Sequence, residues 1–209
     1  MRLILIFLFI ANCALCENQW SRLRGNNGSG VAEGSTPPIK LDLNNPTWKT
    51  PVSNGHSSPV LSNKLIFLTG TEDGQLTTYA FRKKNGKLAW QSKLPKVNLE
   101  RVHQANSPAA PTPITDDKYI FVYFGSFGMV CYDHTGKEQW QKRLPVPRTL
   151  YGTSSSPIEY NNLIILVIDD DNNLPNSRLS RSKIIALKKS DGSVAWETPR
   201  PFHRSGWST

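Results

Sequence analysis

Cysteine is scarce in this sequence, and its scarcity limits how the fold can be stabilised. Only three cysteines occur among the 209 residues, and two of them, Cys13 and Cys16, lie close to the N-terminus. Cleavage of the chain after Cys16 leaves Cys131 alone, and a single cysteine cannot form an internal disulfide. Cys131 alternates with strand-forming residues, so we expect a buried apolar side chain rather than a reactive thiol. The fold must therefore be held by packing and hydrogen bonds.

Motifs of several enzyme classes are missing as well. The histidines show no zinc-binding spacing such as His-Glu-x-x-His, and the serines before apolar runs lack a Gly-x-Ser-x-Gly elbow. Gly25, Gly28 and Gly30 form a glycine-rich run, but no strand precedes it and no Lys-Ser/Thr ends it. We therefore do not interpret this run as a phosphate-binding loop. No stretch shows a convincing helical periodicity, which favours an all-β fold.

Charge of one sign is in excess, but it is not concentrated in the sequence. The formal net charge is +9, and the basic residues are scattered, mostly in turn segments such as Arg82-Lys83-Lys84 and Lys188-Lys189. A nucleic-acid site requires basic residues clustered on one face. We therefore expect solvated basic turns and no nucleic-acid partner.

The N-terminus has the pattern of a secretory signal peptide covering residues 1–16. Arg2 supplies a positive charge, Leu3 to Ile10 is an unbroken apolar run, and Ala14-Leu15-Cys16 fits a cleavage site. The apolar run is too short to cross a bilayer as a stable helix. We expect a secreted protein of the periplasm or cell envelope.

The two N-terminal cysteines raise the question of lipidation. Cys13 or Cys16 could accept a lipid, although Asn12 and Leu15 stand where that signal usually has a small residue. An acyl chain would add membrane association. The sequence leaves both alternatives open.

Three similar segments, each ending on a tryptophan, follow one another along the chain. They run from Ser57 to Trp90, from Ala110 to Trp140 and from Ser154 to Trp196, so that the tryptophans are 50 and 56 residues apart. Self-similarity with this period indicates a repeat architecture, and the spacing is close to that of a four-stranded propeller blade.

Each segment contains the same order of strand and turn signals. The apolar runs 65–68, 119–124 and 163–168 predict strands buried on both faces. Asn85-Gly86, Thr135-Gly136 and Asp191-Gly192 predict tight turns, and each glycine lies four residues before the tryptophan. We expect a first strand that carries Ser/Thr-Pro and a fourth strand that ends on the tryptophan.

These signals give the predicted organisation of the chain. An entry segment covers residues 17–45, and three blades cover about residues 46–95, 105–145 and 150–199. Residues 205–209 are expected to begin a further blade. Because propellers typically have 4–8 blades, three blades form an incomplete ring, and we expect an N-terminal fragment of a larger propeller.

The repeat resembles that of the pyrroloquinoline-quinone (PQQ)-type propeller family, and the chain is similar to secreted propellers of the BamB type. The resemblance rests on Ala80…Gly86-Lys87…Trp90, Cys131…Gly136-Lys137…Trp140 and Ala186…Gly192-Ser193…Trp196. It implies that the tryptophans lock each blade to its neighbour. The residues expected in this structural role are Trp90, Trp140, Trp196, Gly86, Gly136 and Gly192.

The resemblance supports two functions. The favoured one is a non-catalytic binding or scaffolding platform, with other envelope proteins or an unidentified ligand as partners and with no cofactor. The alternative is a PQQ-dependent quinoprotein oxidoreductase whose catalytic residues lie in the missing C-terminal part. The enzyme class implies PQQ, Ca²⁺ ligands, an aspartate base and a vicinal cysteine pair, and this sequence has no such pair.

Candidate site residues are few, and none is assigned a catalytic or metal-binding role. Asp169-Asp170-Asp171 with Asn172 and Asn173 resembles a calcium loop only in part, because Leu174 replaces the turn glycine and Ser180 the final glutamate. We expect a solvated hairpin loop there. The positions expected on the face that carries the connections between blades are His103, Arg148, Asp169, Asp171 and His203.

Overall fold

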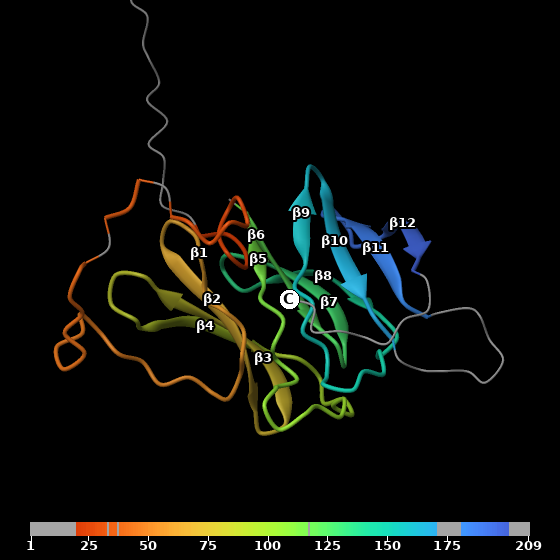
Figure 1. Ribbon diagram of the computed structural model, residues 1–209, viewed down its shortest axis with the longest axis horizontal. Helices are drawn as coiled ribbons and strands as arrows, with labels where there is room; N and C mark the ends of the chain where they lie inside the picture. Colours follow the sequence, from red (N-terminus) through yellow and green to blue (C-terminus); the bar gives the residue numbers. More distant parts are fainter. Residues whose placement is uncertain (1–19, 33, 37, 117, 171–180, 201–209) are drawn as a thin grey trace, which may run out of the picture.

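Figure 1 presents the computed structural model, which describes residues 20–32, 34–36, 38–116, 118–170 and 181–200. Within these ranges the chain forms twelve β-strands and no helix. Accordingly, no helix of this part of the chain could cross a membrane. Several predictions fall outside the described residues. These are the signal peptide 1–16 with Cys13 and Cys16, the sites Asp171 and His203, and the stretch 205–209.

The strands form three antiparallel sheets of four strands, each in sequence order, which confirms the predicted all-β class. The sheets follow one another across Figure 1, from the first (orange to olive) through the second (green) to the third (cyan to blue). Sheet 1 contains β1 (Val60–Leu61), β2 (Leu65–Glu72), β3 (Gln75–Arg82) and β4 (Leu88–Lys93). Sheet 2 contains β5 (Ile114–Thr115), β6 (Tyr119–Phe124), β7 (Gly128–Asp133) and β8 (Glu138–Arg143). Sheet 3 contains β9 (Ile158–Tyr160), β10 (Leu163–Ile168), β11 (Lys183–Lys188) and β12 (Val194–Pro199).

The core consists of two layers, one on each side of sheet 2. Strand β6 supplies both, because successive side chains of a strand point to opposite faces. Ile120, Val122 and Phe124 pack in the layer shared with sheet 1, and Phe121 and Tyr123 in the layer shared with sheet 3. The central sheet is therefore enclosed by its two neighbours.

Only one of the three apolar runs is buried on both faces. Residues 120–124 are all buried, whereas the run 163–168 alternates between buried and half-buried residues, and 65–68 is mostly half-buried. The prediction of three doubly buried strands was therefore wrong for sheets 1 and 3. The reason is that the described residues place a neighbouring sheet on both faces of sheet 2 alone.

The hairpins between third and fourth strands each contain a turn glycine, and the turn of sheet 2 is one residue shorter than the other two. Gly86, Gly136 and Gly192 have φ angles of 66°, 90° and 69°, in the left-handed region that favours glycine. Next to each turn the register between the third and fourth strands shifts, opposite Ala80/Phe81, Cys131/Tyr132 and Ala186/Leu187 of the third strands, which is the signature of a β-bulge.

Two boundary predictions need correction. The fourth strands do not end on tryptophan, because β4 continues past Trp90 to Lys93, which still pairs with Thr77 of β3. The Ser/Thr-Pro pairs precede the first strands rather than lie in them. Their hydroxyls link neighbouring sheets instead, since the Ser58 N–H donates to Thr112 Oγ1 (3.0 Å) and the Thr112 N–H donates to Ser156 Oγ (3.0 Å).

Three tryptophans pack on the hairpin turns in the same way: Trp90 and Trp140 join one sheet to the next, and Trp48 joins the segment before β1 to sheet 1. Trp48, Trp90 and Trp140 each lie against a turn glycine so closely that an added Cβ would come within 3 Å of the indole ring. Each indole N–H also donates to a carbonyl of the same turn. The acceptors are Lys83 for Trp48 (3.1 Å), His134 for Trp90 (2.9 Å) and Lys189 for Trp140 (2.8 Å).

Candidate functional site

Two long connections cover one end of the sheets. Residues 94–113 link sheet 1 to sheet 2, and residues 144–157 link sheet 2 to sheet 3. Between them lies a pocket with a cavity volume of about 90 Å³. Its lining includes Asn106, Tyr123, Thr149, Tyr151, Thr153 and Asp169.

The two connections are fixed to each other by hydrogen bonds to one carbonyl. The Tyr151 carbonyl accepts from the His103 backbone N–H (3.1 Å) and from Asn106 Nδ2 (2.9 Å). The His103 and Tyr151 rings also meet edge to face, with 5.7 Å between centroids. Gly152 has a φ of 93° and packs against Val102, so a side chain there would be strained and would clash. The surface is therefore preorganised.

A buried carboxylate strengthens this junction. Glu100 Oε2 accepts hydrogen bonds from the Thr153 backbone N–H (3.0 Å) and from Thr153 Oγ1 (2.8 Å). The Glu100 N–H donates to Ser126 Oγ (2.8 Å) in the β6–β7 turn. An added Cβ at Gly125 would overlap both Glu100 and Thr153, so glycine is required where this turn approaches them.

Burial controls the electrostatics of this junction. Desolvation raises the pKa of Glu100, and the two hydrogen bonds from Thr153 oppose that shift without cancelling it. Glu100 Oε1 has no hydrogen-bond partner among the described residues. Desolvation also raises the pKa of Tyr123, and the Glu100 charge adds to the shift. The site therefore favours a neutral Glu100 more than an exposed position would.

The predicted site residues fall in different places. His103 lies on the first connection, and Asp169 lines the pocket, where its carboxylate pairs with Arg200. Arg148 is exposed on the second connection and does not line the pocket. As noted above, Asp171 and His203 lie outside the described residues.

Sequence reasoning missed the residues that fix the site, namely Glu100, Tyr123 and Thr153. One signal was available, because Glu100 is the only acidic residue of the connection 94–113. Its partner Thr153 lies 53 residues away, so no local pattern reveals the pair.

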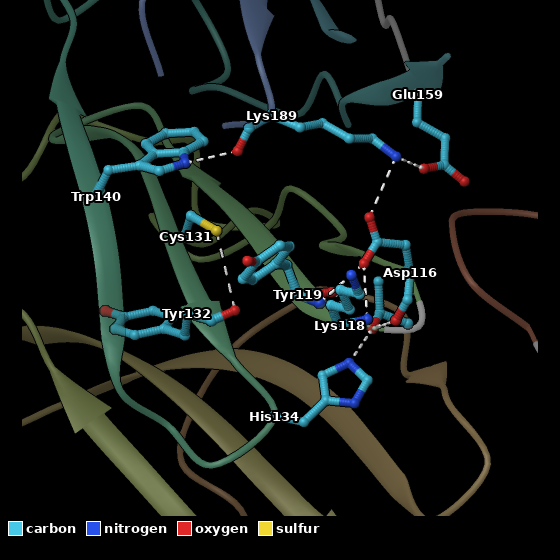
Figure 2. A network of polar contacts seen from close by, with 10 residues as sticks. Asp116, Lys118, Tyr119, Cys131, Tyr132, His134, Trp140, Glu159 and Lys189 are labelled. Atoms are coloured by element: carbon cyan, nitrogen blue, oxygen red, sulfur yellow. Dashed lines mark hydrogen bonds and ion pairs between the residues drawn. The ribbon is translucent and has the colours of Figure 1, made fainter. Parts of the chain in front are cut away.

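The opposite ends of sheets 2 and 3 are held together by ion pairs (Figure 2). Lys189 Nζ lies 2.6 Å from Glu159 Oε2 and 3.2 Å from Asp116 Oδ2. Burial lowers the pKa of Lys189, but the hydrogen bonds and charges of Glu159 and Asp116 outweigh it and raise the pKa overall. This ammonium therefore stays charged and joins Glu159 of β9 in sheet 3 to Asp116, which directly follows β5 of sheet 2.

Cys131 lies near this network but takes no part in it. Its side chain is buried, and its Sγ lies 3.9 Å from the Tyr132 carbonyl. Burial raises the pKa of Cys131 to about 12, with further contributions from Asp116 and Asp133. The neutral thiol is a packing group, as expected, since thiolate is the reactive form.

The pocket between the two connections does not fit a quinone cofactor. The described residues contain no group of three or more His, Cys, Asp or Glu side chains that could hold a metal ion. The pocket of about 90 Å³ is far below the roughly 300–1,000 Å³ of typical cofactor sites. The Asp169 carboxylate that lines it is already paired with Arg200. PQQ does not fit here, and we derive no reaction step through it.

Comparison with protein families gives a match over most of the chain. A family model described as "Outer membrane protein assembly factor BamB" matches residues 27–150 and residues 78–206. A search of curated protein sequences finds no match.

Two solved structures with TM-scores above 0.5 share the fold at low identity. Quinohemoprotein alcohol dehydrogenase from Comamonas testosteroni has a TM-score of 0.57 and 13% identity, over 87% of this chain and 27% of its own. A europium-containing methanol dehydrogenase has a TM-score of 0.54 and 16% identity, over 71% of this chain and 25% of its own. BamB from Moraxella catarrhalis has a TM-score of 0.45 and 18% identity, over 73% of this chain and 41% of its own. The chain thus spans well under half the length of these proteins.

Proposed function

Because this chain belongs to the BamB family of PQQ-repeat propeller proteins, we propose that it is a non-catalytic binding platform of the cell envelope. Its partner in this proposal is another envelope protein, held on the face formed by the connections 94–113 and 144–157. The family description supports the location, and the residues of that face support the mode of action.

The observation that carries the proposal is an exposed apolar stretch on a rigid support. Val146 and Leu150 are 47% and 49% exposed, and Arg148 lies exposed between them. The following residues are fixed, because Tyr151 and Thr153 are hydrogen-bonded to the first connection. Apolar and arginine side chains on a preorganised backbone are typical of protein-binding surfaces.

The test is a double variant, Val146→Ser with Leu150→Ser, compared with a matched control. Tyr160→Ser removes a large exposed side chain, 65% exposed, at the other end of sheet 3. Crosslinking in envelope preparations followed by mass spectrometry identifies the bound proteins. We expect the double variant to lose a partner that the wild-type chain and the control both retain. Identical partner sets for all three chains would contradict the proposal.

The enzymatic alternative is tested separately. The protein is reconstituted with PQQ and Ca²⁺, and alcohol-dependent dye reduction and quinone absorbance are measured. We expect neither signal. Retention of PQQ together with turnover would overturn the non-catalytic proposal.

A further inference from the structure

One corner of sheet 1 gathers basic residues that are far apart in the sequence. The β3–β4 turn is tied to the β1–β2 turn, because the Lys83 N–H donates to the Lys64 carbonyl (2.9 Å). The segment around Lys49 reaches the same turn, since Trp48 Nε1 donates to the Lys83 carbonyl (3.1 Å) and Thr50 Oγ1 to the Gly86 carbonyl (2.6 Å). The residues of this basic corner are Lys49, Lys64, Arg82, Lys83, Lys84 and Lys87.

The charge of the basic corner is not neutralised within the described part of the chain. None of its six side chains forms an ion pair there. The acidic residues of sheet 1 lie at the other end of the strands, Glu72 as the last residue of β2 and Asp73 in the turn that follows it. They pair there with Lys93, at 3.3 and 3.8 Å. Five of the six basic residues are exposed, and Lys83 is half-buried.

The other two sheets show that the fold does not require this charge. In the equivalent turns the glycine N–H also donates to the carbonyl of the last residue of the third strand, from Gly136 to Asp133 (3.0 Å) and from Gly192 to Lys188 (2.9 Å), although the sheet 2 turn is one residue shorter. In sheet 1 the Gly86 N–H donates to the Arg82 carbonyl (2.8 Å). The sheet 2 turn mixes acidic and basic residues, and Lys189 in sheet 3 is paired with two carboxylates. The unpaired positive charges in the sheet 1 turn repel one another, and the turns of sheets 2 and 3 form without such an excess.

We propose that the basic corner docks the protein onto an anionic phospholipid surface. The six residues lie on turns, at the end of β3 or on the segment before β1, and they line neither of the two pockets near sheets 2 and 3, which argues against a small anion as the ligand. Lysines near an anionic membrane each strengthen binding about fivefold. Val52 and Leu88, which are 52% and 48% exposed, flank the corner and can contact the lipid interface.

Membrane docking through the basic corner is a second function, in addition to the proposed binding of a partner protein and compatible with it. The corner lies at the start of β4, and the connection 94–113 leaves from the end of the same strand. A protein docked through this corner therefore leaves the face formed by the connections, with the exposed side chains of Val146 and Leu150, accessible to a partner. The two functions use different residues, so each can fail without the other.

The test compares two triple variants with the same change in charge. Arg82→Gln, Lys84→Gln and Lys87→Gln together remove three exposed cations from the basic corner. The control removes three exposed cations from turns of sheets 2 and 3, namely Lys118→Gln, Lys137→Gln and Lys188→Gln. Cosedimentation is measured with vesicles of phosphatidylcholine, with and without phosphatidylglycerol, at about 0.15 M and about 0.5 M salt. Circular dichroism confirms that both variants are folded.

We expect the wild-type chain and the control to bind the anionic vesicles at the lower salt. The corner variant should bind at least about tenfold more weakly, and the higher salt should abolish binding. Equal losses in the two variants, or equal binding to neutral vesicles, would overturn the proposal. Tighter binding to single-stranded DNA or to a poly-glutamate peptide than to the vesicles would overturn it in favour of that partner.

Discussion

At the scale of single residues, one tryptophan in each junction between sheets both packs on a turn glycine and donates a hydrogen bond to the turn. The indole ring of Trp140 covers Gly192, and its N–H satisfies the Lys189 carbonyl. Burial of a large ring supplies area, and the hydrogen bond fixes its orientation. Trp196 stands at the same position of its strand but is 41% exposed. Tryptophan therefore contributes more to the stability of the fold at position 140 than at position 196.

This difference predicts the outcome of two alanine substitutions. Trp140→Ala should lower the free energy of unfolding by about 3–5 kcal/mol, because it leaves a cavity and an unpaired carbonyl. Trp196→Ala should cost about 1 kcal/mol or less. Urea-induced unfolding, followed by fluorescence and circular dichroism, measures both. Equal costs would show that the indole contact with Gly192 does not hold sheets 2 and 3 together.

Also at the scale of single residues, the raised pKa of Glu100 predicts that the stability of the fold depends on pH. Burial raises its pKa in the folded state above the ordinary value of 4.5, so between these two values the folded protein binds more protons than the unfolded chain. Its contribution to stability is therefore greatest at low pH and is lost as the pH rises through that window. Glu100→Gln should remove this loss and keep an oxygen that accepts from Thr153.

The measurement is the urea midpoint of the wild-type chain and of Glu100→Gln across the acidic range. The stability of the wild-type chain relative to the variant should fall as the pH rises. A constant difference would contradict a buried, titrating Glu100. The Asp133 and Asp191 carboxyls, whose pKa values are lowered, are present in both chains and cancel in the comparison.

At the scale of strands and turns, neighbouring sheets are joined at both ends of their strands. One end has the contact between the connections, where Thr153 donates to Glu100. The other end has Lys189 between Asp116 and Glu159. The Lys189 side chain is 19% exposed and the two carboxylates 27% and 28%, so the ion pairs are only partly screened by solvent.

Removing this ammonium should weaken the junction more than removing an exposed one. Lys189→Met should cost about 1–2 kcal/mol, between the values for exposed and buried pairs, because it leaves two carboxylates unpaired. Lys183→Met is the control, since its partner Glu197 is 52% exposed, and it should cost less than about 0.5 kcal/mol. Thermal unfolding at low salt measures both, and a larger cost for Lys183→Met would refute this account of the junction.

At the scale of the whole molecule, the three similar sheets differ in how far they are buried from solvent. Sheet 2 lies between two packed layers, whereas strand β12 of sheet 3 is exposed along its whole length. Ile158 and Tyr160 of β9 are 49% and 65% exposed. Stability in a repeat protein depends on contacts between neighbours, so the enclosed sheet should be the most stable.

Native-state hydrogen exchange tests whether sheet 2 is the most stable of the three sheets. Amides of β6 and β7 should exchange at least about tenfold more slowly than those of β9 and β12, because opening the central sheet disrupts both core layers. Mass spectrometry of peptides from each sheet gives the rates. Uniform protection would indicate that the three sheets open as one unit.

The sequence by itself determined the repeat, the strand class and the turns. Antiparallel hairpins are local, and Gly86, Gly136 and Gly192 specify their turns within a few residues. The tertiary structure alone decided which faces are buried, which is why the runs 65–68 and 163–168 differ from 119–124. It also placed Thr153 on Glu100 and brought Lys49 and Lys64 to the turn of Lys84. These contacts join residues far apart in the chain, and no periodic pattern encodes them because they depend on how the sheets pack.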